Sequence, residues 1–145
     1  MLIRQATKDD LLPLLQLYTH LHDNAMPSIN TELQDLWNGI MADNNHHIII
    51  GLYDDIIVTS CVLIVVPNLT HNQRPYALIE NVVTHEAYRN KGHATAVLHY
   101  AKEIAVSENC YKIMLMTGSK TEKTLRFYEK AGYNQTDKTA FIQWL

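Results

Sequence analysis

The spacing of hydrophobic residues predicts one short strand and two helices in the N-terminal part of the chain. Leu2 to Ala6 alternates between apolar and polar positions, as a half-buried strand does. Thr7, followed three positions later by Asp10, is typical of a helix start. Because proline is tolerated only in the first turn, the helix is expected to begin close to Pro13. Apolar residues at helical spacing in 31–41 predict a second helix.

The rest of the chain predicts strands first and then alternating helices and strands. Isoleucine-rich segments at 47–53 and 56–66 are separated by Asp54–Asp55, which predicts a hairpin with a tight turn. The further expected elements are a strand at 76–84, a helix at 92–108, a strand at 112–117, a helix at 121–131 ended by Gly132, and one or two strands in 134–145. Antiparallel hairpins thus precede a strand–helix–strand unit. This order predicts a single α/β domain over 1–145, of mixed α+β type, with a mixed and mostly antiparallel sheet.

Composition excludes several classes of function and partner. The 145 residues carry 12 basic and 15 acidic side chains, so no basic excess is present to bind nucleic acid without sequence preference. The longest apolar run, 56–66, is too short for a membrane-spanning helix, and the N-terminus does not resemble a signal peptide. With two cysteines in no redox or metal spacing, a cytoplasmic protein is expected. The eight histidines show no metal-ligand spacing, so no metal is expected.

The stretch from Arg89 to Ala94 carries the most informative chemistry in the sequence. A strand is expected before it and an amphipathic helix from Gly92 onward. The first N–H groups of a helix lack internal partners and lie at the positive end of its dipole, so they bind phosphate readily. Gly92 lets a bulky anion approach the backbone, and Arg89 and Lys91 add positive charge. An ordinary helix start with two surface cations is the alternative interpretation.

Two motifs together resemble the GNAT superfamily, the Gcn5-related N-acetyltransferases. Arg89-x-x-Gly92-x-Ala94 is similar to the pyrophosphate signature of that family, and Phe127-Tyr128-Glu129-Lys130-Ala131-Gly132-Tyr133 is similar to its second hallmark. They stand in the family's order and spacing, and the expected elements match the family fold along nearly the whole chain. The resemblance implies helices on both faces of the sheet and a bulge in the strand at 76–84, which splays from its neighbour. It also implies acetyl-CoA as co-substrate.

The resemblance implies a set of coenzyme-binding residues. Backbone groups near Val82, Val83 and Thr84 would bond the pantetheine arm and polarise the thioester carbonyl. The pyrophosphate would be held mainly by main-chain N–H groups of the segment Arg89, Asn90, Lys91, Gly92, His93, Ala94 and Thr95. Thr121 stands where many relatives place an asparagine that bonds the arm, and Tyr128 lies at the edge of the coenzyme site.

Two residues are expected to move protons during direct transfer to an amine. Tyr128 stands at the family's acid position, and a tyrosine with its usual pKa of ~10 can donate to the departing thiolate at neutral pH. Glu80 lies in an apolar strand and aligns with an acidic residue that draws the amine proton in many relatives. A packed aromatic ring and a structural or solvent-facing carboxylate are the respective alternatives.

The acceptor is expected to be a primary amine of a small molecule. By the resemblance, the loop between the first two helices would shape its site, with His22, Asp23 and Glu80 as candidate contacts. Residues 110–115 also look like glucosamine-6-phosphate N-acetyltransferases. Met116, however, replaces an aspartate of those enzymes, and the following loop is longer, so that substrate is not favoured.

Three alternatives to this acceptor and activity stay open. They are a non-catalytic acyl-CoA-binding regulatory module, a fold-sharing interaction protein and an acetyltransferase acting on proteins or peptides. The apolar segment 141–145 is compatible with a homodimer or with completion of the internal sheet.

Overall fold

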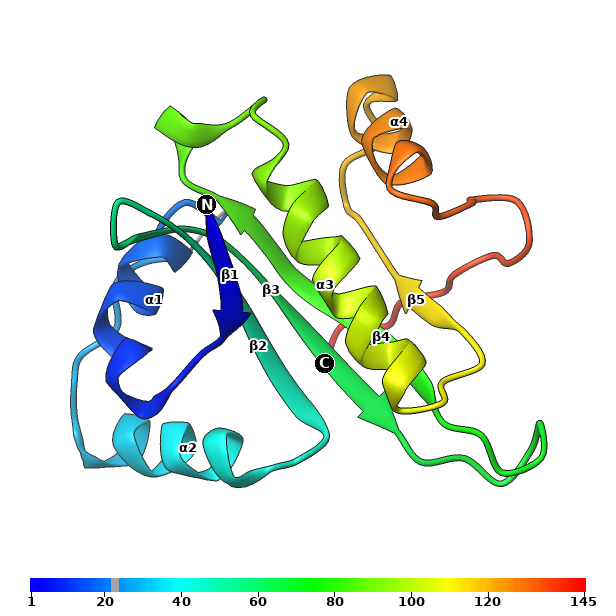
Figure 1. The fold of residues 1–145 in the computed structure, drawn as a ribbon, viewed down its shortest axis with the longest axis horizontal. Coiled ribbons are helices and arrows are strands. Elements are labelled where there is room, and N and C mark those ends of the chain that lie inside the picture. Colours follow the sequence, from blue (N-terminus) through cyan, green and yellow to red (C-terminus); the bar gives the residue numbers. More distant parts are fainter. Residues whose placement is uncertain (22–23) are drawn as a thin grey trace. The chain divides into compact units, whose positions relative to one another are not determined.

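The element order expected from the sequence is confirmed up to residue 133 in the structure, a computed structural model that describes residues 1–21 and 24–145. The chain divides into two compact units, Met1–Met114 and Leu115–Leu145. The elements in chain order are β1 (Leu2–Gln5), η1 (Lys8–Asp10), α1 (Leu11–Tyr18), α2 (Thr31–Ala42), β2 (His46–Tyr53), β3 (Ile56–Val66), β4 (Tyr76–Thr84), η2 (Glu86–Tyr88), α3 (His93–Ser107), β5 (Ile113–Leu115) and α4 (Glu122–Lys130) (Figure 1). Within the described residues, no helix is both long and apolar enough to cross a membrane.

The sheet has the strand order β1-β2-β3-β4-β5, and its first three pairings are antiparallel. Two backbone bonds join the N-terminal end of β4 to the residues before β5, from Tyr111 N–H to the Pro75 carbonyl (2.9 Å) and from Ala77 N–H to the Lys112 carbonyl (3.0 Å). The residue numbers rise together along both segments, so β5 runs parallel to β4 (Figure 1). The sheet is therefore mixed and mostly antiparallel, as expected.

Alternating side chains of β2 and β3 point to opposite faces of the sheet, and each face is covered by helix. One face carries a buried cluster with α1 and α2, made of Leu14, Leu17, Trp37, Ile48, Ile50, Ile57, Val62 and Val83. The residues between them, such as Cys61, turn to the other face, where the Cys61 thiol lies 3.6 Å from the Val97 carbonyl of α3. Helices thus cover both faces of the sheet in the N-terminal unit (Figure 1).

Gly51 of β2 is required by the close approach of the Thr59 side chain on the neighbouring strand β3. A Cβ at this position would lie 2.6 Å from Cγ2 of Thr59 and 3.2 Å from Sδ of Met1, while the 3.5 Å to Cγ1 of Val97 in α3 is an ordinary contact. A side chain at residue 51 would therefore have to displace Thr59.

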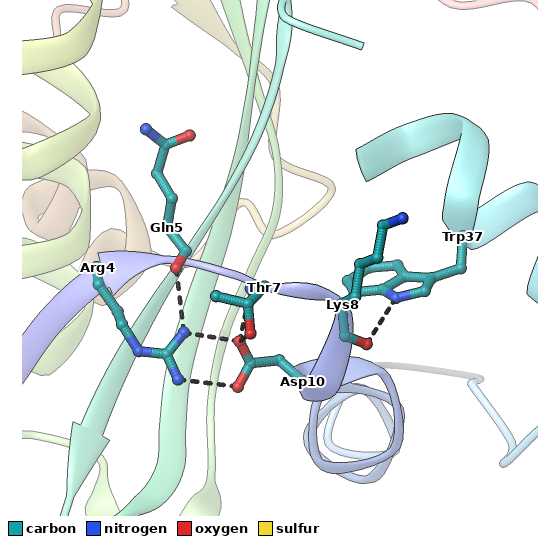
Figure 2. A network of polar contacts seen from close by, with 6 residues as sticks. All are labelled: Arg4, Gln5, Thr7, Lys8, Asp10 and Trp37. Carbon is teal, nitrogen blue, oxygen red and sulfur yellow. Dashed lines mark hydrogen bonds and ion pairs between the residues drawn. The ribbon is translucent and has the colours of Figure 1, made fainter. Parts of the chain in front are cut away.

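The N-terminal strand is joined to the first helix by a charged network (Figure 2). The Asp10 carboxylate accepts hydrogen bonds from the Thr7 N–H (2.6 Å) and the Thr7 hydroxyl (2.9 Å). It also forms a two-pronged ion pair with the Arg4 guanidinium at 2.6 and 2.9 Å. The Trp37 indole N–H donates to the Lys8 carbonyl at 3.0 Å, which attaches α2 to the same turn. These contacts confirm the helix start that Thr7 and Asp10 predict.

The C-terminal unit contains α4 but not the expected final strands. Gly132 ends α4 with φ of +97°, in the left-handed conformation that the sequence predicts for it. Beyond it, described residues 134–145 form no helix or strand, so the prediction of one or two strands there was wrong. Asn134 instead closes a local turn, its side-chain oxygen accepting from the Thr136 and Asp137 N–H groups. Asparagine competes with strand pairing in this way.

Removal of the Asp10 charge is expected to destabilise the protein in a pH-dependent way. The hydrogen bond from Arg4, with those from Thr7, lowers the pKa of Asp10 from 3.8 to about 2. Because the folded pKa lies below the unfolded one, the stabilisation is complete above pH ~5 and is lost as the pH falls toward 2. Asp10→Asn should therefore lower the free energy of unfolding by about 2 kcal/mol at pH 7.

Urea unfolding of the native chain and the variant at pH 7 and pH 3 measures this effect. The difference between the two proteins should shrink at pH 3. Asp9→Asn is the matched control, because Asp9 is an exposed neighbouring carboxylate. An equal difference at both pH values would show that the carboxylate charge is not what stabilises the turn.

Candidate active site

A bulge interrupts the pairing of β3 with β4. Ser60 pairs with Val83 on one side of the bulge, and Val62 pairs with Glu80 on the other. Between these pairs a single β3 residue, Cys61, faces two β4 residues, Asn81 and Val82. Asn81 has φ of +50°, a left-handed conformation that asparagine tolerates better than most residues. A bulge leaves the extra residue unpaired and bends the strand. The bulge expected in this strand is thus confirmed.

Glu80 lies immediately before the bulge, with its side chain exposed. Its pairing with Val62, a member of the α1–α2 cluster, places it on the sheet face that those helices cover. Among the described residues no hydrogen bond or ion pair engages its carboxylate. Of the interpretations that the sequence left open for Glu80, the exposed side chain agrees with a carboxylate that faces solvent, and its role as a base stays a prediction.

The turn after β4 leads into the N-terminus of α3 with its first amides free. Gly92 is the N-cap, with φ of +80°, and no side chain caps this end of the helix. The first helical bond runs from the Ala96 N–H to the Gly92 carbonyl at 3.1 Å. Within the described chain, the N–H groups of residues 92–95 have no hydrogen-bond partner. They form the anion-binding arrangement expected from the sequence, with the helix beginning at His93 directly after its glycine cap.

The space in front of Gly92 is open on the protein side. A Cβ built at this position would meet no atom of the described residues within 4 Å. Glycine is needed here for its positive φ and for access to the backbone, not to avoid a clash within the protein. An anion can therefore approach the amides directly.

The two cations of the turn bond backbone carbonyls. The Arg89 Nε donates to the Thr84 carbonyl at 3.1 Å, and one of its terminal nitrogens lies 3.5 Å from the His20 carbonyl. The Lys91 ammonium donates to the Ala87 carbonyl at 3.1 Å and lies 5.1 Å from the centre of the Tyr88 ring. Both side chains are exposed, so their positive charge still acts on the space around the turn. The sequence indicated their charge but not these contacts.

Aromatic rings from three separate elements support the turn. Tyr53 at the end of β2 lies 5.8 Å from Tyr88 and 6.4 Å from His93, between ring centres. Tyr88 and His93 are themselves 6.3 Å apart. His85 lies 5.5 Å from Tyr88 and 4.0 Å from His20, which follows α1. Sequence reasoning missed this cluster, because no local pattern connects residues 20, 53 and 93.

Tyr18 is half-buried against the cluster that contains Val83 beside the bulge. Burial is the largest cause that raises the pKa of Tyr18 to about 12, with the Ser60 hydroxyl acting against the rise and the nearby Cys61 adding to it. Tyr18 therefore stays protonated at neutral pH. Ser60 is the β3 residue that pairs with Val83 beside the bulge. In the sequence, Tyr18 is one of several apolar positions of a helix, so nothing there distinguished it from the core.

The remaining predicted residues belong to the C-terminal unit or fall outside the description. Thr121 is the N-cap of α4, and its hydroxyl accepts from the Thr124 N–H at 3.4 Å. Tyr128 is half-buried, with its ring centre 4.8 Å from that of Phe127 and 6.3 Å from that of Tyr133. The coenzyme and acid roles of Thr121 and Tyr128 stay predictions. His22 and Asp23 lie outside the described residues.

Among the described residues, no group of three or more histidine, cysteine, aspartate or glutamate side chains is arranged to hold a metal ion.

The structure is thus that of an α/β protein in which a bulged strand leads, through the turn at 85–92, into a glycine-capped helix with free amides. The sequence profile of the acetyltransferase (GNAT) family matches residues 14–133. A glucosamine 6-phosphate N-acetyltransferase of Trypanosoma brucei brucei is 32% identical over 141 residues, covering 94% of this chain and 90% of the relative. The chain belongs to the GNAT acetyltransferase family.

Solved structures agree with this assignment. A protein of Agrobacterium tumefaciens assigned as an acetyltransferase superposes with a TM-score of 0.91 at 35% identity, over 99% of this chain and 100% of that one. The glucosamine-6-phosphate N-acetyltransferase of Arabidopsis thaliana superposes with a TM-score of 0.84 at 20% identity, over 99% and 97% of the two chains. The latter likeness shows the fold alone.

Proposed function

We propose that the protein transfers the acetyl group of acetyl-CoA to a primary amine of a small molecule, by direct attack while both substrates are bound. The observation that carries this proposal is the uncapped N-terminus of α3 directly after the bulged β4. GNAT proteins use acetyl-CoA as co-substrate, and the two features supply the two binding functions that this coenzyme requires. The N–H groups at the start of α3 would bind its diphosphate, and the bulge of β4 would offer unpaired backbone groups beside it.

The pyrophosphate would bind the N–H groups at the start of α3. Residues Gly92, His93, Ala94 and Thr95 provide free donors at the positive end of the helix dipole. The backbone of Arg89, Asn90 and Lys91 forms the turn in front of them, and Asn90 also takes a left-handed conformation, with φ of +62°. The exposed Lys91 ammonium adds charge at the same edge.

The pantetheine arm would run along β4 at the bulge. Backbone groups of Val82, Val83 and Thr84 are the proposed partners, with a contact from the Thr121 hydroxyl. An N–H near Val82 would donate to the thioester carbonyl, whose oxygen gains negative charge as the amine attacks. A bulge supplies such a donor because it removes a residue from ladder pairing.

Glu80 and Tyr128 would move the protons of the reaction. The amine must lose its proton before nitrogen can attack the thioester carbon, and the exposed carboxylate of Glu80 is open to accept it through water. The carbon–nitrogen bond forms and the nitrogen releases its second proton to water; the carbon–sulfur bond then breaks, and the departing thiolate takes the phenolic proton of Tyr128. The resulting phenolate regains a proton from solvent after the coenzyme leaves.

A small amine, rather than a protein, is the proposed acceptor. The curated relative acts on glucosamine 6-phosphate, and aminoglycoside acetyltransferases share the fold at 14% identity. Met116 and the longer loop after β5 distinguish this chain from the glucosamine-6-phosphate pattern, so the proposal covers amines beyond that sugar. His22 and Asp23 stay proposed acceptor contacts.

The function is tested by release of free thiol from acetyl-CoA in the presence of a panel of amines. The panel contains glucosamine 6-phosphate, aminoglycosides, polyamines and a lysine-containing peptide. Turnover of at least one small amine well above the amine-free rate is expected. Turnover of the peptide alone would favour a protein acetyltransferase. Coenzyme binding without turnover of any amine would favour a non-catalytic module.

Gly92→Glu is expected to abolish coenzyme binding, because its carboxylate would enter the space where the diphosphate approaches the amides. Gly92→Ala is the matched control. Both variants carry the same strain at positive φ, roughly 1 kcal/mol, but only the first adds negative charge. Calorimetry with coenzyme A should show loss of measurable binding for the glutamate variant and a much smaller loss for the alanine variant. Equal affinities for the two variants would remove this turn from the coenzyme site.

Tyr128→Phe is expected to lower kcat by at least about tenfold, since the thiolate would leave without a proton donor. The KM for acetyl-CoA should change far less. Tyr133→Phe removes the same group from the ring next to it and serves as the control. The acid role is excluded by a variant whose kcat stays within twofold of the native value.

A further inference from the structure

The end of α1 is joined to the turn after β4 by two contacts. The Arg89 guanidinium bridges the Thr84 carbonyl (3.1 Å) and the His20 carbonyl (3.5 Å). The His20 ring lies against the His85 ring, with centres 4.0 Å apart. His20 is thereby held against Arg89 and His85, although more than 60 positions separate it from them in the sequence.

The His20 carbonyl is a suitable partner for a cation. α1 ends at Tyr18 and tightens into a final turn with three short-range bonds, from the N–H groups of Thr19, His20 and Leu21 to the carbonyls three residues earlier. Carbonyls at a helix C-terminus lack internal partners and carry the negative end of the dipole. A guanidinium satisfies such a carbonyl and can bridge to a second one, whereas a lysine ammonium lacks the planar fork to do so.

These contacts fix the end of α1, which packs on the same face of the sheet as Glu80 of β4. Tyr18, the last residue of α1, packs against the buried cluster that includes Val83 beside the bulge. The end of α1 therefore lies on the side of the sheet where an amine would reach the carboxylate.

We propose that Arg89 is a positioning residue for the acceptor, acting through the end of α1. The proposal rests on the proposed function for the identity of the reaction, but its structural part stands by itself. The backbone of Arg89 belongs to the turn before α3, where the coenzyme diphosphate is proposed to bind (the coenzyme turn), while its side chain bonds the carbonyls of Thr84 and His20. Arg89 thus connects the coenzyme turn with the end of α1, beside the proposed acceptor site.

The first test is amide hydrogen exchange of the free protein, comparing the native chain with Arg89→Met. The N–H groups of Thr19, His20 and Leu21 should exchange at least about fivefold faster in the variant, since their turn loses its attachment. Arg74→Met is the matched control. Arg74 also bonds two carbonyls through its guanidinium, those of Asn109 (3.1 Å) and Cys110 (3.0 Å), away from α1. It should leave the three amides unaffected.

The second test uses acetyl-CoA and the amine of the panel that is turned over fastest. Arg89→Met should raise the KM for the amine by about fivefold, and by more than it raises the KM for acetyl-CoA. Arg89→Lys should recover only part of this loss, because it restores the charge without the fork. His20→Ala, which removes the ring contact with His85 but keeps the His20 carbonyl and the Arg89 side chain, should shift the amine KM in the same direction and guards against a folding defect in the arginine variants.

Unchanged exchange of the three amides in Arg89→Met would overturn the proposal. An increase in KM for acetyl-CoA alone would also overturn it, because it would show that the guanidinium contacts the phosphate. If no amine is turned over, the proposed function fails, and the exchange comparison still decides whether Arg89 fixes the end of α1. The two failures are therefore distinguishable.

Discussion

The site depends on unpaired backbone donors at the start of α3. Gly92 places these amides at the end of a strand because it can adopt positive φ, and no side chain of the described residues caps them. A free helix terminus usually costs stability unless a partner satisfies it. Here the exposed position lets water do so in the free protein, and a diphosphate can replace that water. The bulge lies in the strand that precedes this helix terminus, the aromatic rings pack against the turn before it, and the two cations lie in that turn.

The bulge in β4 links sheet architecture to chemistry. One extra residue in the strand shifts the register between Ser60 and Val62, and it separates Glu80 from the residues that lead into the coenzyme turn. The same shift keeps Glu80 and Val83 on one face of the sheet, where α1 packs. In the proposed function, the acceptor amine and the coenzyme would meet across this single strand. Arg89 attaches the end of α1 to the turn before α3, so the proposed acceptor and diphosphate sites would share a support.

Most of the fold could be predicted, because it rests on local periodicity. The hairpin at Asp54–Asp55, the helix start at Thr7, the cap at Gly132 and the bulged strand follow from short-range patterns or from the resemblance that the two motifs carry. The final strands could not be predicted correctly. Alternating apolar residues permit a strand, but a strand also needs a neighbour to pair with, and sequence does not supply one. Whether Glu80 is paired or exposed could not be predicted for a related reason, since burial is a property of the packed sheet.

The sequence by itself determined the family and the glycine-capped helix start at which phosphate binding is proposed, because both depend on residues that are close together in the chain. Glycine at position 92 and the motif around Tyr128 need no tertiary contact to be recognised. Only the tertiary structure decided what the side chains of the turn contact. The carbonyls that Arg89 bonds, the rings around Tyr88 and the packing of Tyr18 against the core cluster join residues that are distant in sequence. Such contacts are fixed by the packing of α1 and β2 against the sheet, which no short-range pattern encodes.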